Sequence, residues 1–116
     1  MGRFLGASQF RSIPNTFNQT NDVVSNITLS VNSAYFVNTS GGAITLTLPQ
    51  SPAPGEFVDI FDAYGKFDTN NCIVNPSGDG STVGGFADNL TINLARANVR
   101  LQYSANKNDW VVTQLL

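Results

Sequence analysis

The sequence has no histidine and a single cysteine, Cys72, among its 116 residues. Without histidine the chain cannot form a Ser–His–Asp triad, a Cys–His pair or a histidine acid/base catalyst. Most zinc sites are also excluded, because their ligands come from cysteine and histidine. A lone cysteine rules out a disulfide within the chain. The sequence therefore predicts a protein that is not an enzyme and that holds no metal or cofactor.

Charge is scarce as well. Only 12% of the residues are charged, whereas about a quarter are charged in a typical soluble domain. The net charge is −2 and the six basic residues are scattered, so we expect no nucleic-acid partner. Asparagine, serine, threonine and glycine take the place of the missing charged residues, and this composition favours strands joined by turns. It also favours surfaces that lie against other subunits, where charge is costly to desolvate.

Long hydrophobic runs are missing too. No stretch is long and apolar enough to span a membrane, so we expect no membrane partner. The first ten residues contain no continuous hydrophobic segment of the kind that forms a signal peptide. Four N-x-Ser/Thr sequons, at Asn18, Asn26, Asn38 and Asn89, are interpreted as by-products of the composition.

Residues 1–22 are predicted to be an extended N-terminal arm. Their apolar side chains follow neither the helical nor the strand period, yet they are too numerous for a simple disordered tail. We expect the arm to gain order by docking, either on a neighbouring subunit or back over its own domain. The candidate contacts are Arg3, Phe4, Leu5, Phe10, Arg11, Ile13 and Phe17.

Residues 23–116 are predicted to form one β-domain. Apolar and polar residues alternate in short runs that are separated by glycine, proline and asparagine turns. About eight such runs predict a single β-sandwich or jelly-roll-like domain of short antiparallel strands. The expected strands are 26–32, 34–37, 43–48, 57–61, 71–74, 90–94, 98–103 and 110–115.

Few side chains offer chemistry. Asp59 and Asp62 are the best acid/base candidates, and an enzyme hypothesis would depend on them. At this spacing, however, they point to opposite faces of an extended strand. Asp79 lies in a glycine-rich loop that lacks the ligand spacing of a calcium site. Cys72 is interpreted as a small core residue, because no basic partner is near it in the sequence.

Four aromatic residues allow two interpretations. Tyr35, Tyr64, Tyr103 and Trp110 would suit a platform on which sugar rings stack. Tyr103 and Trp110, however, lie on two strands of a predicted hairpin, where cross-strand aromatic pairs build cores. We therefore favour a core role for this pair.

Several segments resemble the short β-rich domains of tailed-phage structural proteins, as found in fibres, spikes and capsid decoration proteins. They share a tyrosine-led strand ending in Thr-Leu-Pro, a glycine-led strand, a glycine-punctuated middle and a closing tryptophan strand. The matching segments are 35–49, 54–62, 99–104 and 110–112. The resemblance implies a compact sandwich or jelly-roll unit, commonly trimeric, on the virion surface, and it transfers no catalytic residue.

Two functions follow as expectations from this resemblance. The first is a capsid decoration or cement protein that forms a homotrimer and docks through its arm on virion proteins such as the major capsid protein. Its own Met1 and short arm favour a small stand-alone protein on the capsid surface over a whole fibre. The alternative is a tail-fibre or spike module that binds host surface glycan through residues such as Tyr64, Phe67 and Phe86.

Overall fold

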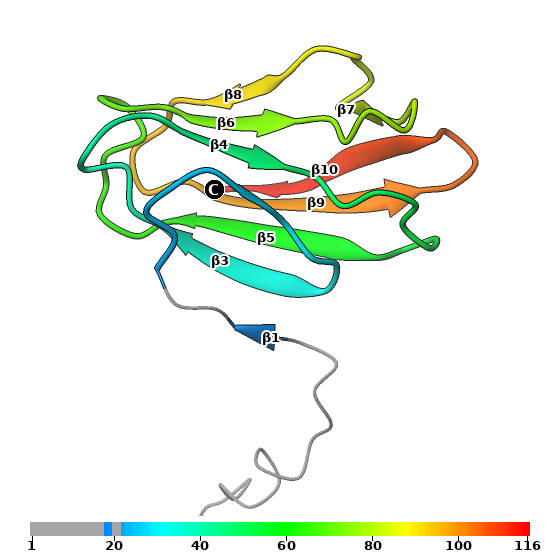
Figure 1. Cartoon of the computed structure of the whole chain (residues 1–116), viewed down its shortest axis with the longest axis horizontal. Helices are drawn as coiled ribbons and strands as arrows, with labels where there is room; N and C mark the ends of the chain where they lie inside the picture. Colours follow the sequence, from blue (N-terminus) through cyan, green and yellow to red (C-terminus); the bar gives the residue numbers. More distant parts are fainter. Residues whose placement is uncertain (1–17, 20–21) are drawn as a thin grey trace, which may run out of the picture.

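The computed structural model describes residues 22–116 and the backbone of Asn18–Gln19. The described residues form ten short strands and contain no helix (Figure 1). They therefore contain no helix long and apolar enough to cross a membrane. The strands are β1 (Asn18–Gln19), β2 (Ile27–Thr28), β3 (Ser33–Val37), β4 (Ile44–Thr47), β5 (Phe57–Asp62), β6 (Cys72–Asn75), β7 (Thr82–Val83), β8 (Leu90–Ile92), β9 (Asn98–Ser104) and β10 (Asp109–Leu115).

The strands make two sheets that face each other across one core. The larger sheet has the order β1-β3-β5-β9-β10-β7, and the smaller has the order β2-β4-β6-β8. From β1 to β6 the chain alternates between the two sheets, so each pair of strands forms one coil. Strands of successive coils pair in parallel: β3 lies between β1 and β5 in the larger sheet, and β4 lies between β2 and β6 in the smaller one. This part of the fold is a short solenoid-like stack.

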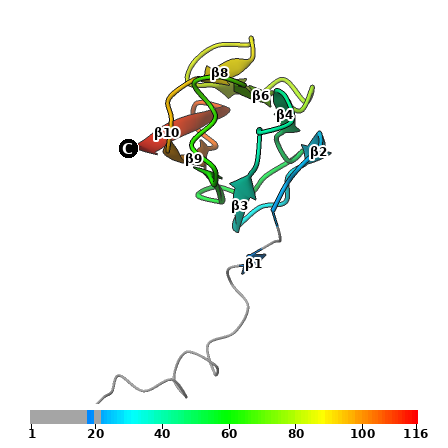
Figure 2. The ribbon, with the colours of Figure 1, turned by 90° about the vertical axis from the view of Figure 1, so that its left-hand side faces the viewer.

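Antiparallel strands close the stack at one end. β8 pairs antiparallel with β6 in the smaller sheet, while β9 pairs with β5 and continues into a hairpin with β10 in the larger one. β7 adds a short parallel pairing to the start of β10. The all-β prediction is confirmed, but the expected antiparallel sandwich or jelly roll is wrong, because the first six strands pair in parallel. Figure 2 shows the two layers end-on.

The core explains why these segments are strands. In β4, Ile44 and Leu46 are buried while Thr45 and Thr47 lie half-buried on the other face. In β5, Val58 and Ile60 point inward in the same way. A period of two places one apolar set on the inner face of each sheet, and burial of that set stabilises the two layers.

Asparagine side chains link one coil to the next. The Asn26 side-chain oxygen accepts a hydrogen bond from the Thr45 backbone N–H at 2.8 Å. The Asn70 side-chain amide donates to the Thr39 carbonyl at 2.8 Å. The side-chain oxygen of Asn32, a residue with a φ of 56°, accepts a hydrogen bond from the Phe57 backbone N–H at 3.3 Å. These contacts use the asparagines as turn residues, since their short amides satisfy backbone groups where the ladders end.

Most predicted strands are present with small shifts at their ends. The main correction concerns residues 26–32, where the strand is confined to Ile27–Thr28 and the chain turns at Val31 and Asn32. The predicted arm, residues 1–22, lies outside the described residues except for Asp22 and the backbone of β1, which pairs with β3 at Ser33 and Ala34.

Candidate interaction surfaces

The residues predicted to make assembly contacts belong to the arm. All of them precede the described part of the chain, so their role stays a prediction. They are Arg3, Phe4, Leu5, Phe10, Arg11, Ile13 and Phe17.

Asp59 is held in an ion pair on the outer face of the larger sheet. Its carboxylate accepts two hydrogen bonds from Arg100 of the neighbouring strand β9, at 2.7 and 2.8 Å. The Arg100 guanidinium also lies 4.1 Å from the centre of the Phe57 ring. Both carboxylate oxygens of this buried group are thus engaged by one fork-shaped donor, as suits a structural pair.

Asp62 organises the turn that follows β5. Its carboxylate accepts backbone hydrogen bonds from Lys66 at 3.1 Å, Phe67 at 3.0 Å and Arg96 at 2.9 Å. Burial alone would raise the pKa of Asp62, but these hydrogen bonds outweigh it and hold the pKa below its usual value. Asp59 and Asp62 therefore have separate partners and do not share a site, as the strand spacing predicts.

The loop acid Asp79 is also committed to local structure. It accepts hydrogen bonds from the Ser81 hydroxyl at 2.6 Å and from the backbone N–H groups of Ser81 and Ser51, each at 3.0 Å. These bonds, led by the Ser81 hydroxyl, hold the pKa of Asp79 well below its usual value. Asp79 thus ties two loops together. Within the described residues, no group of three metal-ligating side chains gathers here or elsewhere.

Cys72 lies on β6 with none of its surface exposed. Burial, assisted by the negative charge of Asp62, raises the pKa of its thiol to about 12. A thiol in this setting is protonated at neutral pH and is a poor nucleophile. The core interpretation of this residue is confirmed.

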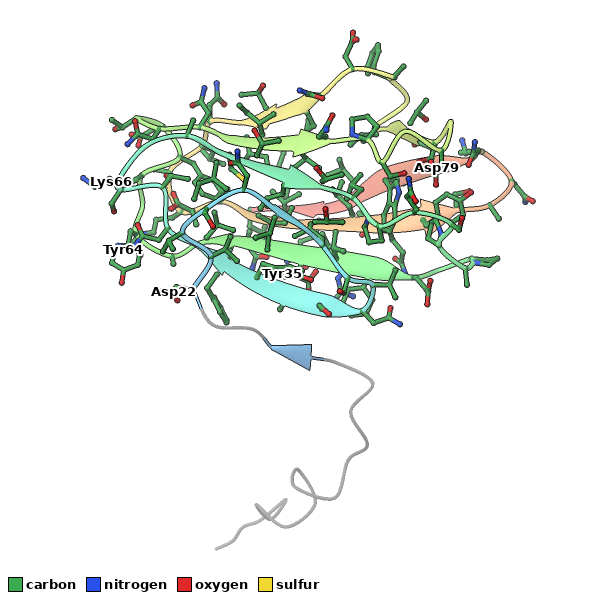
Figure 3. All side chains as sticks on the ribbon, in the orientation of Figure 1. Asp22, Tyr35, Tyr64, Lys66 and Asp79 are labelled. Atoms are coloured by element: carbon green, nitrogen blue, oxygen red, sulfur yellow. The ribbon has the colours of Figure 1, made fainter. Side chains whose placement is uncertain are left out.

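The aromatic platform does not form at the surface. Trp110 is fully buried, and its ring centre lies 5.6 Å from that of Tyr103, its cross-strand neighbour. Tyr35 is also buried, with its hydroxyl within 2.6 Å of the Ser30 backbone nitrogen, which donates to it. Tyr35 belongs to the buried core cluster, while Figure 3 shows Tyr64 at one end of the sheets.

The residues named for a glycan site are not brought together. Phe67 is fully buried. Tyr64 is exposed just after the last residue of β5, whereas Phe86 is exposed beside β7, which pairs with the start of β10. Gln102 pairs with both Phe57 and Val111, so the first residue of β5 lies level with the start of β10. Tyr64 and Phe86 therefore lie at opposite ends of the larger sheet.

β8 and β10 lie on the same side of the two layers (Figure 2), and apolar residues of both strands line a pocket there. The pocket has a volume of about 150 Å³. Leu94 and Leu115, which both line this pocket, are 50% and 60% exposed, so large apolar side chains border it in the open. We call the surface around this pocket the apolar seam, and it comprises Leu90, Ile92, Leu94, Val99, Val112 and Leu115.

Sequence reasoning missed the seam as a site. The alternation of Leu90, Ile92 and Leu94 predicts one buried strand face. The signal that distinguishes a seam from a core face is the position of both strands near the ends of their sheets, and this depends on the pairing order. That order is not encoded in the local pattern.

Comparison with protein-family models and with curated protein sequences finds no match to this chain.

Proposed function

We propose that this chain is a non-enzymatic structural protein of a tailed-phage virion, acting as a capsid decoration or cement protein. The observation that carries the proposal is the apolar seam, where leucines at 50% and 60% exposure border one pocket. A domain that leaves such a surface open gains stability when another subunit covers it. The scarcity of charge supports the same conclusion, because contacts between subunits then desolvate few charged groups.

The chemistry of the domain adds indirect support. The buried carboxylates Asp59 and Asp62 are occupied by Arg100 and by backbone N–H groups. Asp109, also buried, accepts hydrogen bonds from the Thr82 hydroxyl at 2.6 Å and the Gly85 N–H at 2.9 Å. These three acids stabilise the fold through their hydrogen bonds, and the proposed role in assembly does not require a catalytic carboxylate.

In this proposal the arm attaches the domain to the capsid. The arm carries isolated aromatic side chains and two basic residues, Arg3 and Arg11, and an acidic surface on the shell would complement that charge. Partners are the major capsid protein and further copies of this chain. The homotrimer expected from the resemblance stays a prediction.

Arm variants test the attachment. Replacing Phe4, Phe10 and Phe17 with serine in the full chain is expected to abolish attachment to capsids assembled without the protein, because aromatic anchors supply most of the contact energy. Co-sedimentation with the capsids measures this. The matched control is Phe86→Ser, at a side chain 70% exposed in the domain, which should attach normally.

Unchanged circular dichroism would show that the triple variant is folded. Full decoration of capsids by a folded triple variant would contradict the role of the arm. The glycan-binding alternative is less well supported, since Tyr64 and Phe86 lie at opposite ends of the larger sheet and Phe67 is buried.

A further inference from the structure

The smaller sheet has an open edge at β2. β2 is the first strand of that sheet, and the described residues supply no strand beyond it. The Leu29 N–H donates to the Thr47 carbonyl, at the end of β4, at 2.8 Å. Because backbone direction alternates along a strand, the N–H and C=O of Thr28 point to the other side, away from β4. An edge of this kind gains hydrogen bonds when another strand pairs with it.

The core is also less well covered at this edge. Ile27 of β2 and Val31 in the turn that follows are half-buried, whereas Leu46, the partner of Ile27 in the next coil, is fully buried. The terminal coil of a stacked fold needs a cap for this reason. A strand that brings an apolar side chain to this end of the core would supply that cap.

The path of the chain indicates which segment can supply the strand. In the stack, β2 leads into β3 and β4 leads into β5, so each strand of the larger sheet is entered from the smaller one. By the same path, the segment before β1 comes from beside β2. Asn18 of β1 pairs with Ser33 of β3, so one coil advances the chain from position 18 to position 33. The same step ends at Thr28 when it starts from Ile13.

The segment before β1 has the sequence of a short strand. Residues 7–13 contain neither glycine nor proline, and they lie between Gly6 and Pro14. Pro49 and Pro76 likewise follow closely after β4 and β6, the strands with which the segment would align. Proline ends such strands because it cannot donate to the ladder.

The connection to β1 has a matching length. Residues 29–32 join β2 to β3, and residues 14–17 would join the segment to β1. In this register Ser12 pairs with Ile27, whose half-buried side chain packs against the core. Side chains alternate along a strand, so Phe10 points inward and Arg11 points to solvent. Burial of the phenyl ring stabilises the added strand, while the guanidinium stays hydrated.

We infer that residues 9–13 of this chain pair in parallel with the open edge of β2 and close that end of the stack. The inference goes beyond the proposed function, because it concerns how the domain completes its own fold. It also divides the arm. Residues 9–13 belong to the domain, whereas residues 1–8, with Arg3, Phe4 and Leu5, remain for attachment to a capsid.

Hydrogen exchange at the Thr28 amide, followed by NMR in the full chain, tests this inference. The amide should exchange at least about tenfold more slowly in the wild type than in Phe10→Ser or Ser12→Pro. The first substitution removes the apolar contact, and the second removes an N–H that donates along β2. Gly6→Pro is the matched control, because it lies in the arm outside the pairing segment, and it should leave exchange at Thr28 unchanged.

The neighbouring amide provides an internal reference. The Leu29 N–H is bonded to Thr47, so its exchange should stay slow in every folded variant. Fast exchange at Thr28 in the wild type would overturn the inference, as would slow exchange that persists in both segment variants. Protection of Thr28 that grows with protein concentration would show that a neighbouring copy covers the edge, and it would overturn the assignment to the chain's own arm.

These outcomes are separable from those on capsid attachment. A chain that attaches to capsids while Thr28 exchanges fast would overturn the closing strand and leave the proposed function standing. A chain with a protected Thr28 amide and no attachment to capsids would support the closing strand and contradict the cement role.

Discussion

Single carboxylates determine how the loops of this protein are held. Asp62 is buried between the end of β5 and two turns, and it gathers three backbone N–H groups that lie up to 34 positions away in the sequence. Arg96, one of the donors, has a φ of 63°, a conformation that costs free energy for a non-glycine residue. The carboxylate offsets that cost by satisfying the amide.

The neighbouring glycine depends on the same turn. Gly65 has a φ of +68°, and a Cβ at this position would lie 2.8 Å from the Arg96 side-chain Nε. Both the backbone conformation and the close approach therefore favour glycine here. Three residues thus specify the turn after β5. They are Asp62, Arg96 and Gly65, which has no side chain to clash with Arg96.

Asp62→Ala is the residue-scale prediction. At neutral pH the substitution should lower the free energy of unfolding by about 2–4 kcal/mol, because buried N–H groups lose a charged acceptor. The folded-state pKa of Asp62 lies below its unfolded value. Its contribution is therefore complete above the unfolded pKa, near 4, and is lost as the pH falls through the folded pKa.

Urea unfolding from pH 7 down to pH 2 measures this effect. The gap between wild type and Asp62→Ala should narrow as the solution becomes acidic. A gap that stays constant over that range would show that the charge on Asp62 contributes nothing to stability.

At the scale of elements, the fold depends on stacking coils rather than on hairpins. β4 lies between β2 and β6 and is parallel to both, while asparagine side chains extend the links at the ends of the ladders. The high asparagine content therefore serves the coil-to-coil contacts as well as the turns.

Asn26→Ala and Asn70→Ala test these links. Each should lower the free energy of unfolding by about 1 kcal/mol, because each removes one hydrogen bond between coils. Asn106→Ala, in the exposed hairpin turn between β9 and β10, is the matched control and should change stability by less than about 0.5 kcal/mol. Equal effects in all three variants, measured by urea unfolding, would contradict a linking role.

Much of this element scale follows from the sequence. The alternation in residues 43–48 and 98–103 predicts strands that the structure confirms, and the pairing of Tyr103 with Trp110 follows from the hairpin. The direction of pairing does not follow. An alternating pattern with one solvated face is typical of antiparallel sheets. The same local pattern also fits stacked coils, in which each strand pairs in parallel with a strand of the next coil. The seam was missed for the same reason.

At the scale of the molecule, two surfaces carry the proposed assembly. The first is the arm, whose residues precede the described part of the chain. The second is the apolar seam between β8 and β10, where the antiparallel strands close the stack. In the proposed assembly the arm attaches the domain to the shell, and the seam is the apolar surface that a neighbouring subunit covers.

The most direct test of the central claim is to locate the protein in an intact phage particle by cryo-electron microscopy. We expect density for a two-sheet domain on the outer capsid surface, with an arm running onto the shell and a neighbouring subunit over the surface between β8 and β10. Particles that lack the protein, or that carry it solely at the tip of the tail, would contradict the account.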